Sequence, residues 1–153
     1  MNFDDLKKEL KIYPVSKIVF VGLGNPLRQD DAAGLVIIDQ ISKDKNFHQA
    51  HFIKAYTTPE NYLECILKLQ PEIVVIIDTA YWGGRPGEIS WINNRDIETI
   101  AISTHSYSIS FIEKYLKLNG ELDVKYLVIE PLSMDLDMPL SEQIEEKIHY
   151  FFN

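Results

Sequence analysis

The chain has 153 residues and a formal net charge of −8, with 46% hydrophobic and 25% charged residues. This length and composition are typical of one globular domain that buries roughly 68–70% of its unfolded surface. The few basic residues do not cluster, which disfavours a nucleic-acid partner, because phosphate backbones are bound by concentrated positive charge. No apolar run has membrane-spanning length, and the single cysteine, Cys65, cannot form an internal disulfide. We therefore expect a cytoplasmic protein without a nucleic-acid or membrane partner.

The N-terminal end differs from the rest of the chain. Residues 1–16 read as a charged extension, in which a short helix is predicted over residues 4–10. Residues 17–153 contain the apolar periodic segments and are predicted to form a single α/β domain. The sequence does not decide the oligomeric state, for which a monomer is the default.

The first strand and the turn after it organise the domain. Four apolar residues, Ile18 to Val21, run without a polar break, which predicts a strand at 17–23 that is buried on both faces. Gly22 and Gly24 then allow the backbone to turn sharply. A helix is predicted over 31–43, opening at a pair of aspartates. Sites in open α/β sheets form beyond the carboxyl ends of strands, and this turn lies there.

Further strands and helices alternate along the chain. The most apolar run, Ile73 to Ile77, predicts a central strand that ends at Asp78. The alternating segment 88–93 predicts an edge or antiparallel strand. The other predicted elements are strands at 51–56 and 124–129, and helices at 58–69 (capped by Thr58), from 103 or 104 to 119, and after Ser141. The resulting fold class is a three-layer α/β/α sandwich with a mostly parallel, mixed sheet of about five strands.

Three polar residues stand where chemistry is expected. Asp31 follows the first strand across the glycine turn, Asp78 ends the most apolar strand, and His105 lies near the start of the third long helix. Right-handed crossovers would bring the two strand ends to one edge of the sheet. Two carboxylates and one imidazole form a plausible site for a borderline divalent ion such as nickel, zinc or iron, or an acid/base set.

Structural roles for the same residues are also consistent with the sequence. Asp30 or Asp31 has the position of a helix cap, and one of the pair can cap while the other points into the cleft. Asp78 can cap a turn or pair with a basic residue. A single histidine near a helix start, such as His105, is more often a surface residue than a ligand.

The motif GLGNPLRQDDAAG, at residues 22–34, closely resembles the opening motif of the hydrogenase maturation endopeptidases. Members of this family remove a C-terminal peptide from the large-subunit precursor of nickel-iron hydrogenases. The similarity extends over nearly the whole chain after Lys17, and is greatest to the branch that serves the hydrogenase of formate hydrogenlyase. The segments that carry it further are 58–61 (TPEN), 77–80 (IDTA), 86–89 (PGEI), 103–105 (STH) and 129–131 (IEP).

The resemblance implies a function and a set of site residues. The family's two acidic metal ligands fall on Asp31 and Asp78, and its histidine falls on His105. It implies an endopeptidase, of aspartic or metal-dependent type, whose nickel is supplied by the bound precursor and serves as the recognition element. The metal either takes part in hydrolysis or only docks the substrate. Ala32 stands where many relatives have glycine.

Two other functions remain open from the sequence. A non-catalytic, nickel-recognising assembly chaperone would keep the same fold and ligands. The VGLGNP segment at residues 21–26 also resembles the opening of peptidyl-tRNA hydrolases, but the residues that follow, LRQDD, differ from theirs, and the net charge of −8 suits tRNA poorly.

Overall fold

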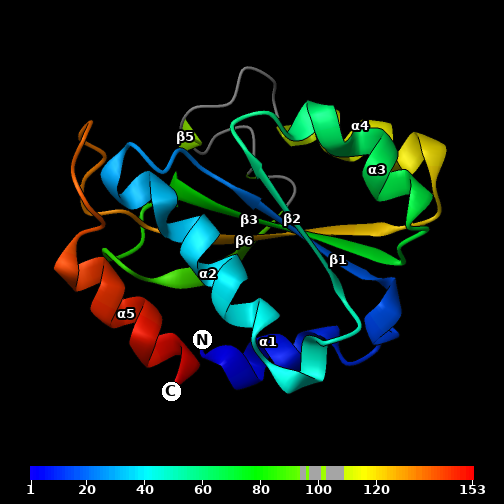
Figure 1. The fold of residues 1–153 in the computed structure, drawn as a ribbon, viewed down its shortest axis with the longest axis horizontal. Coiled ribbons are helices and arrows are strands. Elements are labelled where there is room, and N and C mark those ends of the chain that lie inside the picture. The colour runs from blue at the N-terminus through cyan, green and yellow to red at the C-terminus, as the bar shows by residue number, and fades with distance from the viewer. Residues whose placement is uncertain (94–95, 97–100, 103–108) are drawn as a thin grey trace.

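The computed structural model describes residues 1–93, 96, 101–102 and 109–153. Five of its strands form a sheet in the order β2-β1-β3-β6-β4 (Figure 1). All neighbours pair in parallel except β4, which runs antiparallel to β6. The two-residue strand β5 (Ala101–Ile102) pairs antiparallel with the end of β3. The strands of the main sheet are β1 (Ile18–Leu23), β2 (His51–Tyr56), β3 (Ile73–Tyr81), β4 (Ile89–Ile92) and β6 (Asp123–Ile129).

Helices cover both faces of this sheet, which confirms the predicted α/β/α sandwich (Figure 1). One face carries α1 (Phe3–Leu10), α2 (Ala33–Ser42) and α5 (Glu142–Phe152), and the other carries α3 (Leu63–Lys68) and α4 (Ile109–Asn119). In the part of the chain that the structure describes, no helix has the length and apolarity needed to cross a bilayer. Short 3-10 segments precede or connect these elements: η1 (Val15–Lys17), η2 (Gln29–Ala32), η3 (Lys45–Phe47) and η4 (Pro59–Tyr62).

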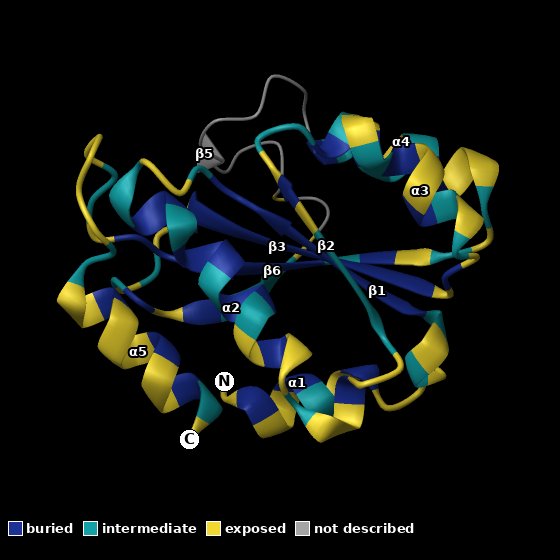
Figure 2. Cartoon of the chain, in the orientation of Figure 1, coloured by how far each residue is buried: buried dark blue, intermediate teal, exposed yellow. Residues whose placement is uncertain are grey.

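The central strands are apolar throughout because both of their faces are buried. In β1, Ile18 and Phe20 pack into the core on the α1/α2/α5 face, whereas Val19 and Val21 pack on the α3/α4 face. Successive side chains of a strand point to opposite faces, so an uninterrupted apolar run fills two cores at once. Figure 2 shows the sheet as the buried layer between exposed helix surfaces.

Helix α1 lies within residues 1–16 and packs on the same core as the rest of the chain. Leu6 is fully buried, and the Phe3 ring contacts aromatic rings from both halves of the sequence. The centroid of the Phe3 ring lies 6.1 Å from that of Phe47 and 4.8 Å from that of Phe152. The N-terminal helix therefore joins the first segment of the chain to the last.

Several predicted boundaries and caps differ in the structure. Strand β3 continues past Asp78 to Tyr81, because β5 and β6 give its last residues pairing partners that the sequence does not reveal. The predicted cap at Thr58 precedes a 3-10 turn and makes no capping hydrogen bond. Ser141 does precede α5, but its side chain does not cap the helix either. The predicted helix start at residues 103–104 lies outside the described residues.

Candidate active site

The candidate site lies between β1 and β3, where successive connections of the chain lead to opposite sides of β1. The chain moves from β1 to β2 on one side and from there across to β3 on the other side of β1. The two connections place α2 and α3 on opposite faces of the sheet (Figure 1). A crevice opens at the carboxyl ends of strands where connections diverge in this way. Asp31 and Asp78 both lie at this edge.

The glycine turn after β1 holds Asp31 against it. Gly24 has a φ of +140°, and a Cβ at this position would lie 2.0 Å from the carbonyl oxygen of Asp31. Only glycine permits both this backbone conformation and so close an approach. The carboxylate of Asp31 then accepts a hydrogen bond from the backbone N–H of Asn25, with an N to Oδ2 distance of 3.0 Å. The side chain is fully buried and turned back toward the strand end.

Asp78 lies one residue beyond the last pair between β1 and β3. That pair is Gly22 with Ile77, and β1 ends one residue later, at Leu23, which places Asp78 at the level of the carboxyl end of β1. Its side chain is only 3% exposed, and Oδ1 accepts the N–H of Thr79 at 2.7 Å. The backbone of α2 passes close by, since a Cβ on Gly34 would lie 3.2 Å from the Cα of Asp78.

The structure therefore brings two of the three predicted site residues to one edge of the sheet. Asp31 approaches it from η2 and Asp78 from β3, and the hydroxyl of Thr79 donates to the carbonyl of Asp30 at 2.9 Å, which ties the two elements together. The third predicted residue, His105, lies outside the described residues. Its place in the site remains a prediction from the sequence.

Asp30 has a role that sequence reasoning missed. Its carboxylate caps no helix, since Ala32 occupies the position before α2. It is fully buried and accepts hydrogen bonds of 2.8–2.9 Å from the backbone N–H groups of Leu132, Ser133 and Ser141 and from the Ser141 hydroxyl. Asp30 thereby fixes the segment between β6 and α5 against η2. The Ser141 hydroxyl, the predicted cap of α5, donates its hydrogen bond to Asp30 instead.

Glu130 is a further buried acid at the same edge. It follows Ile129, the last residue of β6, and its Oε2 accepts the N–H of Trp82 at 2.8 Å and that of Gly84 at 3.3 Å. The side chain is 7% exposed and holds the turn that follows β3. An acid directly after an apolar strand is the same signal that selected Asp78, and applied to residues 127–130 it would also have selected Glu130.

Two buried donors near these acids make no hydrogen bond within the described part of the chain. They are Nε of Arg28, in the turn before η2, and Nε1 of Trp82, in the turn after β3. Buried polar groups are usually paired, so such donors are suited to carbonyl or carboxylate oxygens of a ligand. A bound peptide offers such oxygens.

The described residues supply carboxylates but not a complete metal site. Among them, no three histidine, cysteine, aspartate or glutamate side chains are grouped closely enough to hold an ion. Carboxylate oxygens suit hard and borderline cations, and one imidazole would make the set suitable for nickel or zinc. The described part of the site therefore fits a metal only together with His105 or with ligands from a partner.

The comparisons with known proteins identify the family. The sequence model of the HycI family, described as hydrogenase maturation protease, matches residues 35–153. The chain belongs to the hydrogenase maturation protease family. The match includes Asp78 and His105 and begins just after Asp31.

Relatives of this protease support the same family over most of the chain. A protein of Methanocaldococcus jannaschii, provisionally named hydrogenase maturation protease, is 30% identical to this chain. The match covers 88% of this chain and 83% of the relative. The hydrogenase 3 maturation protease of Escherichia coli is 28% identical, and this match covers 85% of this chain and 83% of the relative. The crystal structure of a [NiFe] hydrogenase maturation protease, HycI, from Thermococcus kodakarensis superposes with a TM-score of 0.82. The two sequences are 25% identical, and the superposition covers 95% of this chain and 92% of the chain of that structure.

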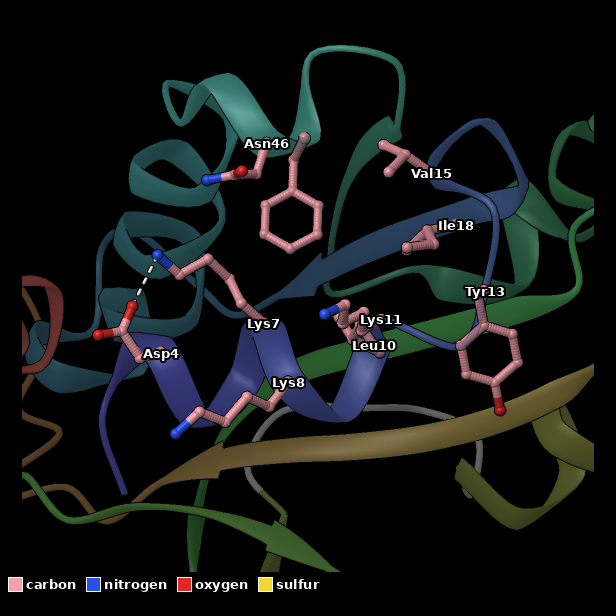
Figure 3. Close-up of a pocket in the computed structure, with 10 residues that line it drawn as sticks. Asp4, Lys7, Lys8, Leu10, Lys11, Tyr13, Val15, Ile18 and Asn46 are labelled. Carbon is pink, nitrogen blue, oxygen red and sulfur yellow. Dashed lines mark ion pairs between the residues drawn. The ribbon is translucent and has the colours of Figure 1, made fainter.

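A cavity of about 430 Å³ lies elsewhere on the protease, at the opposite edge of the sheet. Figure 3 shows it between α1 and η3, with Ile18, the first residue of β1, in its lining. The carboxylate in its lining, that of Asp4, forms an ion pair with Lys7 at 2.7 Å. Because the catalytic candidates lie at the carboxyl ends of the strands, this cavity is not the candidate active site.

Proposed function

We propose that this protease removes the C-terminal peptide from the large-subunit precursor of a nickel-iron hydrogenase, and that nickel already bound in the precursor is its recognition element. This proposal rests on the pair of buried carboxylates, Asp31 and Asp78, which separate elements place at one edge of the sheet. Family membership supports the proteolytic activity. The relative from Thermococcus kodakarensis, which acts in [NiFe] hydrogenase maturation, supports the class of substrate.

The proposed chemistry uses a carboxylate as general base. Nickel in the precursor would be bound by Asp31, Asp78 and His105 together, which places the scissile peptide bond beside the two acids. One carboxylate accepts a proton from water, and the oxygen of that water adds to the carbonyl carbon of the scissile bond. The carbon–nitrogen bond then breaks, and the proton passes to the leaving amine nitrogen. Water is consumed, and two peptide ends are formed.

Cleavage of nickel-loaded and nickel-free precursor tests the recognition step. Purified precursor is incubated with the protease, and mass spectrometry reports the length of the large subunit. We expect a shortened C-terminus only for the nickel-loaded precursor. Equal cleavage of both forms would refute nickel recognition, and binding without shortening of either would refute the peptidase activity in favour of a chaperone.

Substitution of the proposed ligands tests the residue assignments. Asp78→Asn and His105→Ala should each lower the cleavage rate at least 100-fold, because general-base catalysis and metal binding both require these side chains. Glu121→Gln, an exposed acid away from the site, is the matched control and should cleave at the wild-type rate. Wild-type cleavage by either site variant would remove that residue from the mechanism.

A further inference from the structure

Four large apolar side chains are exposed beside the candidate active site. We call this surface the apolar rim, and it consists of Leu27 (63% exposed), Leu132 (49%), Leu136 (68%) and Met138 (49%). Leu27 lies in the turn before η2, and the other three lie in the segment between β6 and α5. Exposed groups of large apolar side chains often mark interaction surfaces.

Hydrogen bonds hold the two segments of the rim together. The N–H of Asp137 donates to the carbonyl of Leu27 at 2.9 Å, and the N–H of Asp135 donates to Oε1 of Gln29 at 3.2 Å. The carboxylate of Asp30 binds the backbone N–H of Leu132. Figure 2 shows this exposed segment beside the N-terminal end of α2. The rim is therefore fixed in place next to η2, the element that carries Asp31.

Two acids beside the apolar rim indicate the chemistry of its partner. Asp135 and Asp137 are exposed and alternate with the apolar residues Leu136 and Met138. Apolar side chains interspersed with acids complement a segment that carries both apolar and basic side chains, because opposite charges at the edge of an interface favour the correct register. The net charge of −8 adds to this preference.

We propose that the apolar rim binds the segment of the hydrogenase precursor next to the scissile bond, and that this segment carries apolar side chains together with a basic one. This inference rests on the proposed function, since it assigns the rim to the same substrate. The rim is continuous with the candidate active site, because Leu27 lies four residues before Asp31 and the backbone N–H of Leu132 donates to the neighbouring Asp30. A peptide that reaches the two buried carboxylates from this side passes over the rim.

The first test is the double variant Leu27→Ser/Leu136→Ser. Loss of two exposed apolar contacts should raise KM for the nickel-loaded precursor at least tenfold while kcat stays within twofold of wild type, because the rim binds substrate but touches no reacting atom. The matched control is Leu118→Ser, an 84% exposed leucine on α4, which should leave KM unchanged. Thermal unfolding confirms that all the variants are folded.

The second test addresses the charge. Asp137→Asn keeps the side-chain size, and asparagine readily adopts the φ of +60° found at this position. We expect KM to rise two- to fivefold at low salt and the difference to disappear at high salt, because salt screens exposed charges. Glu121→Gln is the control for a general loss of negative charge.

The outcomes separate this inference from the proposed function. If wild-type protein cleaves the precursor and the double variant has the same KM as Leu118→Ser, substrate binding by the rim is refuted while the proposed peptidase function is supported. If wild-type protein does not cleave, the function is refuted. Binding of the precursor, measured by surface plasmon resonance, then tests whether the rim is its binding surface. Equally tight binding by the double variant and the wild type would refute this role of the rim.

Discussion

Adjacent aspartates in the opening motif have different structural roles. The carboxylate of Asp31 turns back to the N–H of Asn25, at the edge shared with Asp78. The carboxylate of Asp30 turns to the segment before α5 and accepts four hydrogen bonds there. The two side chains differ because consecutive residues of a tight 3-10 turn point in different directions. Asp31 therefore lies at the edge shared with Asp78, while Asp30 fixes the segment before α5.

Asp30→Asn should destabilise the protein strongly for so small a change. The amide nitrogen replaces one acceptor oxygen, so a donor faces N–H or O–H donors in a fully buried position. We expect the free energy of unfolding to fall by about 2–4 kcal/mol, measured by urea denaturation. Asp137→Asn, which removes an exposed charge, should change it by less than about 0.5 kcal/mol. Similar stability of the two variants would contradict the role assigned to Asp30.

The packing of helix α2 against the strand ends shapes the site at the level of elements. Gly34 lies in the first turn of α2, and a Cβ there would lie 2.9 Å from the carbonyl oxygen of Leu23 and 3.0 Å from that of Ile77. These oxygens belong to β1 and β3, so the helix backbone rests directly on both central strands. The closeness of this packing sets how near η2, and with it Asp31, lies to Asp78.

Gly34→Ala tests this contact. Alanine favours helices by about 1 kcal/mol over glycine, but the added methyl group would meet backbone atoms that cannot move independently. We expect the steric cost to prevail and the free energy of unfolding to fall by about 1–2 kcal/mol, with slower precursor cleavage as α2 shifts. Gly120→Ala is the control, because the nearest atoms there are the ends of leucine side chains. A more stable Gly34→Ala protein would show that α2 can move away from the strands.

The N-terminal segment is tied to the whole molecule by polar as well as apolar contacts. After α1, the hydroxyl of Tyr13 donates to the carboxylate of Asp123 at the start of β6, with an oxygen–oxygen distance of 2.5 Å. Burial, together with this hydrogen bond, raises the pKa of Tyr13 to about 12 from its ordinary value of 10.0. The protonated phenol is the form that the folded state favours.

The stability of the whole molecule should therefore depend on Tyr13 at alkaline pH. A raised pKa contributes stability that is fully present below pH 10, the unfolded value, and is lost as the pH rises toward 12. Tyr13→Phe should have a lower Tm than wild type at pH 8, and the difference should shrink between pH 10 and pH 12. Thermal unfolding followed by circular dichroism measures it. A difference that stays constant over this range would contradict the coupling.

The sequence by itself determined the layered architecture, because a run such as Ile73–Ile77 can be buried on both faces only in the centre of a covered sheet. It also determined that Asp31 follows the first central strand and that Asp78 comes directly after the apolar run of the other, and the carboxyl ends of parallel strands lie at the same edge. Only the tertiary structure decided the roles of Asp30 and Glu130, because their partners lie 46 or more residues away along the chain. Patterns of local periodicity carry no information about such contacts, which depend on how the loops at the sheet edge meet.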